Sequence, residues 1–239
     1  MPVSIAELKV KVFADGADKP TMLRLAQEPW IRGFTTNPTL MRKAGVTDYE
    51  AFARDILRHL PDRPISFEIF ADEFDEMERQ ACRIAEWGDN VFVKIPITNT
   101  RREPSLDLIG RLANRGIRIN VTAVFTMEQV RTAAAALQAS PAAYLSVFAG
   151  RIADTGRDPL PVIAASLELI RPYPNIELIW ASPREVLNVI QADSIGCHII
   201  TATSDILTKL GCLGKNLADY SLETVAMFYE DAAKSHFCL

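Results

Sequence analysis

The residues of this sequence best suited to chemistry are a lysine and several polar side chains within short apolar runs. Lys94 stands between Val93 and Ile95 near the end of the run Val91–Ile97. An amine must be neutral to attack a carbonyl carbon, and apolar surroundings favour the neutral form of a lysine. Lys94 is therefore a candidate Schiff-base nucleophile, although a lone lysine near a strand end more often runs its stem along apolar surface to reach water.

Polar side chains recur near the ends of other apolar runs, mostly with a spacing of two residues. They are Asp15, Thr35 and Asn37, Ser66 and Glu68, and Asn120 and Thr122. A carboxylate at the mouth of a cavity is suited to the proton transfer that breaks a bond beside a substrate hydroxyl. Each residue alone has a structural interpretation, such as capping a helix or holding a loop. Together they favour a site, because polar groups gathered at one end of a fold are destabilising unless they satisfy one another or a ligand.

The elements that must position these residues are strands and helices in alternation. Near-continuous apolar character is typical of parallel strands covered by helices. Eight such runs occur: Val10–Asp15, Gly33–Asn37, Ile65–Phe70, Val91–Ile97, Arg118–Phe125, Tyr144–Gly150, Glu177–Ser182 and Cys197–Thr203. Their alternation with helical segments predicts an α/β fold, a single (β/α)8 TIM barrel over residues 1–239 with an extra C-terminal helix over about 215–239. A doubly wound sheet is the alternative, but the sequence has no G-x-G-x-x-G turn after the first run and no Walker motif.

A second set of residues is suited to phosphate binding at the mouth of such a barrel. Arg151 is predicted to end the sixth strand, Ser182 ends the seventh, and Arg184 comes two residues later. Like Thr126 and Gln129, the sequence SPRE from Ser182 has the capping-box pattern, which predicts a helix that begins at this serine. Two guanidiniums and a helix N-terminus would bind phosphate. The spacing is about equally compatible with a purely structural role. In that case Arg184 would pair only with acids of its helix and Arg151 only with Asp154.

Composition narrows the classes of partner. The net charge of −4 argues against nucleic acid, whereas a small phosphorylated substrate needs only one or two cations. No apolar run approaches the length of a membrane span, and the first residues lack a signal-peptide core, so we expect a cytoplasmic protein without membrane segments. The cysteine and histidine spacing does not indicate a metal site, so we expect no metal, no cofactor and free thiols. These residues are Cys82, Cys197, Cys212, Cys238, His59, His198 and His236.

Five motifs follow the order in which they occur in the transaldolase family. They are TTNP at Thr35–Pro38, VKIPIT at Val93–Thr98, N-x-T at Asn120–Thr122, FxGRI at Phe148–Ile152 and AS-x-R at Ala181–Arg184. The chain resembles this family through nearly its whole length, and VKIP is the most specific element. The resemblance implies that Lys94 is the Schiff-base nucleophile and Asp15 the base for the C–C step. It implies that Glu68 and Thr122 position the water used for proton transfer.

The resemblance also implies how a sugar phosphate would be bound, with no cofactor. Asn37, Asn120 and Ser146 match positions that hold the hydroxyls of the ketose, and Arg151, Ser182 and Arg184 match the phosphate site. Thr35 and Phe148 complete the predicted substrate-binding set. The implied reaction is that of the pentose phosphate pathway, in which a dihydroxyacetone unit passes from a ketose phosphate such as fructose 6-phosphate to an aldose phosphate. Short members of the family assemble as pentamer-based rings or decamers, so we expect a homo-oligomer, with a dimer as a further possibility.

Two alternatives to a transaldolase stay open. The related fructose 6-phosphate aldolases release dihydroxyacetone without an acceptor; they carry a glutamine at the position of Glu68 and a tyrosine at that of Phe148, so both residues favour transaldolase. A non-catalytic barrel that only binds a sugar phosphate is the other alternative. The sequence departs from the usual family pattern at Gly16, at Val147, at Trp180 and in the segment Thr201–Leu207.

Overall fold

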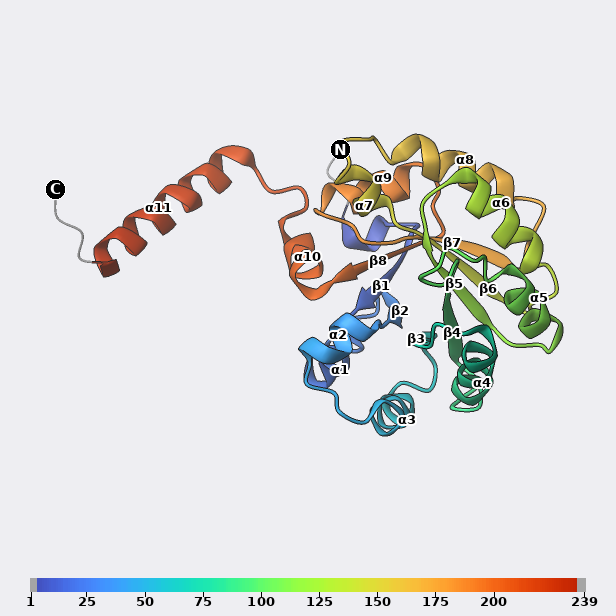
Figure 1. Cartoon of the computed structure of the whole chain (residues 1–239). Coiled ribbons are helices and arrows are strands. Elements are labelled where there is room, and N and C mark those ends of the chain that lie inside the picture. The colour runs from blue at the N-terminus through green and yellow to red at the C-terminus, as the bar shows by residue number, and fades with distance from the viewer. Residues whose placement is uncertain (1–3, 236–239) are drawn as a thin grey trace.

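The computed structural model of the chain describes residues 4–235, in which eight parallel strands form a closed barrel in sequence order (Figure 1). The strands are β1 (Lys11–Asp15), β2 (Ile31–Thr35), β3 (Ile65–Glu68), β4 (Val91–Pro96), β5 (Ile119–Val124), β6 (Ala143–Val147), β7 (Ile176–Trp180) and β8 (Ile199–Thr203). Each coincides with one of the eight predicted runs, with small differences at the ends. The predicted (β/α)8 barrel is confirmed.

Helices follow the strands and cover the outside of the barrel (Figure 1). They are α1 (Lys19–Leu25), α2 (Pro38–Lys43), α3 (Tyr49–His59), α4 (Phe74–Ala85), α5 (Leu106–Asn114), α6 (Met127–Ala136), α7 (Ala149–Ala153), α8 (Leu160–Ile170), α9 (Leu187–Ser194), α10 (Ser204–Lys209) and α11 (Leu217–Ser235), with short 3-10 turns at Ile5–Glu7 and Leu210–Cys212. The capping box at Thr126 is confirmed, because its hydroxyl accepts from the Gln129 backbone and the Gln129 side chain accepts from the Thr126 backbone.

Two predictions near the phosphate-binding set were wrong. The helix predicted to begin at Ser182 is α9, which begins at Leu187, so Ser182 is not its N-cap. Ser182 instead has a left-handed backbone with φ of 60°, which a helix N-cap does not adopt. Arg151 does not end strand six either, because β6 stops at Val147 and Arg151 lies within α7.

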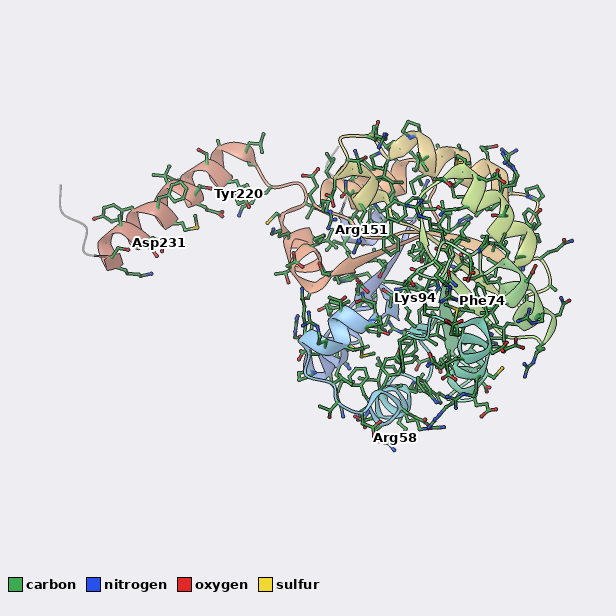
Figure 2. The ribbon with its side chains drawn as sticks, viewed as in Figure 1. Arg58, Phe74, Lys94, Arg151, Tyr220 and Asp231 are labelled. Carbon is green, nitrogen blue, oxygen red and sulfur yellow. The ribbon has the colours of Figure 1, made fainter. Side chains whose placement is uncertain are left out.

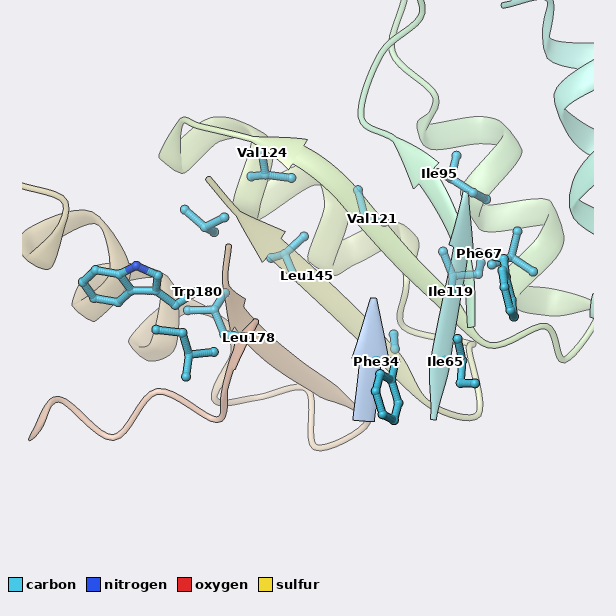
Figure 3. Packing of buried hydrophobic residues seen from close by; sticks show 14 of the residues in the cluster. Phe34, Ile65, Phe67, Ile95, Ile119, Val121, Val124, Leu145, Leu178 and Trp180 are labelled. Atoms are coloured by element: carbon cyan, nitrogen blue, oxygen red, sulfur yellow. The ribbon is translucent and has the colours of Figure 1, made fainter. Parts of the chain in front are cut away.

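The main apolar core lies between the outer face of the barrel and its helices. Side chains such as Phe34, Phe67 and Leu178 are fully buried in it (Figure 3). Val147 and Trp180, two of the positions that depart from the family pattern, are neighbours on β6 and β7 and also belong to this outer layer. These departures therefore change the helix-facing core and do not narrow the interior of the barrel.

A smaller apolar cluster fills the barrel at the N-terminal ends of its strands. Phe92 and Tyr144 stack with their ring centroids 4.0 Å apart, and Phe13 meets Tyr144 edge to face at 5.8 Å. Gly33 on β2 makes room for Phe13, because a Cβ atom at this position would lie 2.6 Å from the Phe13 ring. All three rings are buried, so this end of the barrel is closed by aromatic side chains.

The predicted extension over 215–239 contains α11, which projects away from the barrel (Figure 1). None of its residues is buried, and Figure 2 shows Tyr220 and Asp231 on this projecting helix. The last residues of the extension, 236–239, which include His236 and Cys238, and residues 1–3 lie outside the described part. Between residues 4 and 235, no helix combines the length and the apolar character needed to cross a membrane.

Candidate active site

The C-terminal ends of the strands surround a cavity of about 500 Å³, a size typical of pockets that bind small molecules. Most of the predicted site residues line it. Those that do are Asp15, Thr35, Asn37, Glu68, Lys94, Thr122, Ser146, Phe148, Arg151 and Ser182. They come from seven of the strands or the segments that follow them, so the closed barrel brings together residues that are far apart in sequence.

Lys94 lies deep in this cavity, and Figure 2 places it inside the barrel. Its side chain is only 7% exposed, and its Nζ is 3.0 Å from Glu68 Oε2. The two residues are direct neighbours across β3 and β4, which puts both side chains at the same level. Nζ also donates a hydrogen bond of 3.1 Å to the backbone carbonyl of Thr36. The amine is therefore held in one place beside a carboxylate that is able to accept its proton.

Asp15 faces the same cavity from the end of β1. Burial raises the pKa of its carboxyl above the usual range, the charge of Lys94 and a hydrogen bond from Thr35 oppose this shift, and the charge of Glu68 adds to it. Thr35 donates to Asp15 Oδ1 at 2.7 Å, and its hydroxyl is 2.6 Å from that of Thr201 on β8. A carboxylate with a raised pKa is a better proton acceptor than an ordinary aspartate.

Three buried polar side chains beside the cavity form a hydrogen-bonded chain, and Asn120 in its centre is the register neighbour of Lys94. The amide of Asn120 donates to Ser66 Oγ at 3.0 Å, and the hydroxyl of Ser146 donates to Asn120 Oδ1 at 2.8 Å. All three residues are buried. Asn120 does not line the cavity, unlike the other predicted contacts to the ketose, and its amide is used to fix Ser146, which does.

Thr122 lies directly before a strained residue of β5. The next residue, Ala123, has a φ of 59°, and the pairing of β5 with β6 is irregular at this point. Such strain in a residue other than glycine is concentrated at functional sites. The Thr122 hydroxyl is buried and finds no hydrogen-bond partner among residues 4–235, although it lies at the cavity wall. An unpaired buried hydroxyl is unfavourable unless a ligand or water satisfies it.

The rim of the cavity carries one arginine directed over an aromatic ring. The Arg151 guanidinium lies 5.6 Å from the centroid of the Phe148 ring, which in turn packs against Phe125 at 5.7 Å. Arg151 forms no ion pair with another residue in the described range. Its five N–H donors are thus available at the mouth of the cavity, where they suit a phosphate group.

The structure separates Arg184 from the cavity wall. Its guanidinium pairs with Asp154, with Nε 3.0 Å from Oδ1, and it does not line the cavity. It nevertheless lies beside α7, because a Cβ atom on Gly150 would be 3.2 Å from its Nε and 1.5 Å from the Ser182 carbonyl. The predicted cradle of two guanidiniums and a helix N-terminus is therefore reduced here to Arg151 and Ser182, with Arg184 adjacent.

Several cavity residues were not predicted from the sequence. Pro38, Thr39, Leu40, Pro96, Ala123, Phe125, Ala181 and Thr201 also line it. Ala123 and Ala181 carry no chemical signal, but Thr201 interrupts the apolar run of β8 with a hydroxyl at an inward-facing position. No group of His, Cys, Asp and Glu side chains within residues 4–235 is arranged to hold a metal ion.

Comparison with known proteins agrees with this geometry. The chain is 34% identical over 202 residues to a "Probable transaldolase" of Dehalococcoides mccartyi, which covers 84% of this chain and 90% of the relative. It is 31% identical over 223 residues to a "Probable transaldolase" of Methanococcus maripaludis, with 90% of this chain and 99% of the relative covered. A "Probable transaldolase 2" of Listeria monocytogenes is 34% identical over 202 residues, covering 84% and 88%.

Solved structures with low sequence identity share the barrel architecture. The crystal structure of 2,3-dimethylmalate lyase superimposes with a TM-score of 0.55 at 12% identity, over 98% of this chain and 86% of that one. A structure described as native KDPGal gives a TM-score of 0.52 at 14% identity, over 83% and 84%. These likenesses concern the fold alone.

The match to a family extends along almost the whole barrel and its C-terminal helix. The sequence pattern of the family described as "Transaldolase/Fructose-6-phosphate aldolase" matches residues 12–237, which include all of β1 except Lys11, the strands β2 to β8 and every predicted site residue. Together with relatives at 30% identity or more over most of the chain, this match settles the family. The chain is an enzyme of the transaldolase/fructose-6-phosphate aldolase family.

Proposed function

We propose that this enzyme acts as a transaldolase that moves a dihydroxyacetone unit from a ketose phosphate to an aldose phosphate through a Schiff base on Lys94. The observation that carries the proposal is the buried amine of Lys94, which lies 3.0 Å from the Glu68 carboxylate in a cavity that also contains Asp15. One nucleophile and two carboxylates at the closed end of a pocket supply the groups needed to form and break bonds at a ketone and its neighbouring hydroxyl.

The first chemical step forms the Schiff base. Neutral Lys94 attacks the C2 carbonyl carbon of the ketose, the carbonyl oxygen gains protons, and water leaves as the C=N bond forms. Glu68 accepts the proton that the ammonium group loses, and it exchanges protons with the substrate oxygen through a water held by the Thr122 hydroxyl. That hydroxyl has no hydrogen-bond partner within the described residues 4–235, which supports this role.

The second step breaks the bond between C3 and C4. The carboxylate of Asp15 takes the proton of the C4 hydroxyl, the C4 oxygen forms a carbonyl, and the electron pair of the C3–C4 bond moves toward the iminium nitrogen. An aldose phosphate leaves, and an enamine of dihydroxyacetone stays on Lys94. Its attack on the carbonyl of an acceptor aldose reverses these steps and completes the transfer. The raised pKa of Asp15 supports its role as the base.

The phosphate end of the substrate is proposed to bind at the rim. Arg151 and Ser182 line the cavity there, and Arg184 is adjacent but paired with Asp154. The Arg184–Asp154 pair is exposed, so solvent screening makes it weak and easily exchanged. A phosphate dianion offers Arg184 a bidentate partner of higher charge, which would draw it from Asp154 toward the rim. Asn37 and Ser146 would contact the sugar hydroxyls, while Thr35 and Phe148 shape the wall.

Mixing the enzyme with fructose 6-phosphate alone, and then with erythrose 4-phosphate, tests the proposed function. We expect borohydride reduction with donor alone to leave a three-carbon adduct on the Lys94 peptide, measured by intact mass and peptide mapping. A coupled assay should show sustained turnover only after the acceptor is added. Sustained release of dihydroxyacetone without acceptor would instead identify an aldolase. Binding of the sugar phosphate without adduct or turnover, unchanged in Lys94→Ala, would identify a non-catalytic barrel.

We further propose that the enzyme works as a homo-oligomer in which a second copy covers α11. Seven large apolar side chains of this helix are 45–82% exposed: Leu217, Tyr220, Leu222, Val225, Met227, Phe228 and Tyr229. Leu222, Val225 and Tyr229 recur at the spacing of one helical face. An apolar face of this size is unfavourable in water, and covering each side chain would contribute about 1.5–3 kcal/mol.

Light scattering after size exclusion tests the assembly. We expect the full chain to elute as an oligomer, with a mass that is two or more times the 26.5 kDa of one chain. Changing Leu222, Val225 and Tyr229 together to serine should yield the monomer, because it removes the apolar face. Changing Asp219 and Asp231 to serine is the matched control on the same helix and should leave the assembly intact. A monomeric full chain would contradict the proposal.

We propose that the enzyme works in the cytoplasm, in the pentose phosphate pathway. Cys82, Cys197 and Cys212 are free thiols, which is typical of a reducing compartment such as the cytoplasm. The transfer of a three-carbon unit between sugar phosphates belongs to the pentose phosphate pathway. Both supports are consistent with an enzyme of central carbohydrate metabolism.

A further inference from the structure

We propose that Thr201 of β8 is a positioning residue for the C–C cleavage step, because its hydroxyl holds that of Thr35 in the orientation that donates to Asp15. The proposal rests on the proposed function, in which Asp15 is the base for that step. Thr201 lines the cavity and is only 6% exposed, and its hydroxyl lies 2.6 Å from that of Thr35. The Thr35 hydroxyl in turn donates to Asp15 Oδ1 at 2.7 Å.

The direction of this chain follows from counting protons. An ionised carboxylate only accepts hydrogen bonds, and a threonine hydroxyl has one proton to donate. When Asp15 is ionised, the Thr35 proton is directed to it, so the bond between the two hydroxyls must use the proton of Thr201. Thr201 has no other side-chain hydrogen-bond partner within residues 4–235. The order is therefore Thr201 to Thr35 to Asp15, with every proton assigned.

Packing alone does not explain a threonine at position 201, because the inward positions Ile199 and Phe13 beside it are apolar. Along β8, Ile199 faces the interior cluster, while Ile200 and Ala202 face the helices. Thr201 is the next inward position after Ile199, and the register pairs it with Phe13 of the aromatic cluster. A valine would fill the same volume without a buried hydroxyl. The hydroxyl is thus accounted for by its bond to Thr35.

The consequence for catalysis is that the Thr35 hydroxyl donates to Asp15, the proposed base, in a fixed orientation. A hydrogen bond to a charged group is stronger than one to a neutral group, so the chain stabilises ionised Asp15 more than protonated Asp15. It also holds the carboxylate in one orientation toward the substrate hydroxyl. Hydrogen bonds in series strengthen one another, so removing Thr201 weakens the bond from Thr35 to Asp15.

The other charged groups near Asp15 are unchanged by a substitution at Thr201. Lys94 on β4 and Glu68 on β3 face Asp15 across the cavity, and Arg151 on α7 lines the same cavity. A separate hollow on the outer side of Asp15 is lined by charged groups of α10, of α2 and of the residue that precedes α1. These are Asp205, Lys43 and Asp18. A change in the titration of Asp15 on replacing Thr201 therefore reports the hydroxyl chain.

The test compares Thr201→Val, which removes the hydroxyl at nearly constant volume, with Thr201→Ser, which keeps it. We expect Thr201→Val to lower kcat about tenfold with little change in KM, and to move the acidic limb of the kcat/KM profile to higher pH. Borohydride reduction should trap more six-carbon and less three-carbon adduct, because cleavage is slowed and Schiff-base formation is not. Thr201→Ser should restore all three readouts.

Two further measurements test whether Thr201 acts through Asp15. The first compares kcat in a background without the base, and the second follows the titration of Asp15 and needs no turnover. In an Asp15→Asn background, Thr201→Val should have little additional effect on kcat, because the base through which it acts is gone. The Asp15 resonance in carboxyl-labelled protein, assigned by its absence in Asp15→Asn, should titrate at a higher pH in Thr201→Val. An unchanged titration, pH profile and adduct ratio would overturn the inference. A parent enzyme without turnover would overturn the proposed function, and the titration would still decide the role of Thr201.

Discussion

Replacing Lys94 by methionine is expected to lower kcat by roughly 10⁴-fold or more, because no other group in the cavity is able to form the covalent intermediate. The three-carbon adduct on the Lys94 peptide should disappear with it. Methionine has a similar length and no charge, so the shape of the cavity is largely kept. Initial rates in the coupled assay and peptide mass after borohydride reduction measure the two effects.

The stability of this variant needs its own controls. Removing the amine leaves the Glu68 carboxylate without its partner at 3.0 Å, and an unpaired buried charge is destabilising. The double variant Lys94→Met with Glu68→Gln removes both charges and should fold more stably than Lys94→Met alone. Lys94→Arg keeps the positive charge but gives no Schiff base, and should be as inactive as the methionine variant. Turnover above one hundredth of the parent rate in Lys94→Arg would contradict the role of Lys94.

The second large effect is expected for Asp15→Asn, which should lower kcat by about 10²–10⁴-fold, the range typical of losing a general base. The amide still accepts a hydrogen bond from Thr35, so the geometry of the site is kept. Lys94 is untouched, and the Schiff base should therefore form and then stall before cleavage. Borohydride should trap a six-carbon adduct where the parent enzyme yields the three-carbon adduct.

Folding and pH dependence separate this effect from a loss of structure. Burial raises the pKa of Asp15 in the folded protein, so at neutral pH its ionised form opposes folding. Asp15→Asn removes that ionised group, and the melting temperature should equal or exceed that of the parent. In the parent, kcat/KM should fall as the pH drops through the raised pKa of Asp15, and this limb should be absent from the residual activity of the variant. A three-carbon adduct in Asp15→Asn at the parent's level would rule out Asp15 as the base.

The fold was accessible from the sequence because each strand is a short apolar run and the barrel closes them in order. The position of Lys94 was accessible for the same reason, since strand direction and side-chain alternation place it at the C-terminal end facing inward. Glu68 follows from the register, which makes it the direct neighbour of Lys94. In these cases local pattern and global fold agree.

The phosphate-binding side was predicted less well, and the cause is backbone conformation. The SPRE sequence has the same capping-box pattern as the segment from Thr126, yet only the latter begins a helix at its first residue. Ser182 has a left-handed backbone, and its carbonyl contacts Gly150 of α7. Such tertiary contacts override a local capping signal. Arg184 likewise pairs with Asp154. A sequence pattern does not show whether an arginine pairs with a nearby carboxylate or stays available for a ligand.

The irregular backbone of β5 had no signal in the sequence at all. Ala123 adopts a positive φ although alanine is not a residue type that favours it. The distortion coincides with the irregular pairing of β5 with β6, and Thr122, directly before Ala123, lies at the cavity wall. Pairing between strands is a tertiary contact, so no local sequence pattern predicts where it becomes irregular.

The aromatic cluster of Phe13, Phe92 and Tyr144 bears on the order in which substrates bind and products leave. These rings close the barrel at the N-terminal ends of its strands, and the cavity lies at the C-terminal ends. Under the proposed function, the aldose that leaves after cleavage and the acceptor aldose would pass the same rim and share its phosphate-binding residues. We therefore expect ping-pong kinetics, in which the first aldose dissociates before the acceptor binds to the covalent three-carbon intermediate.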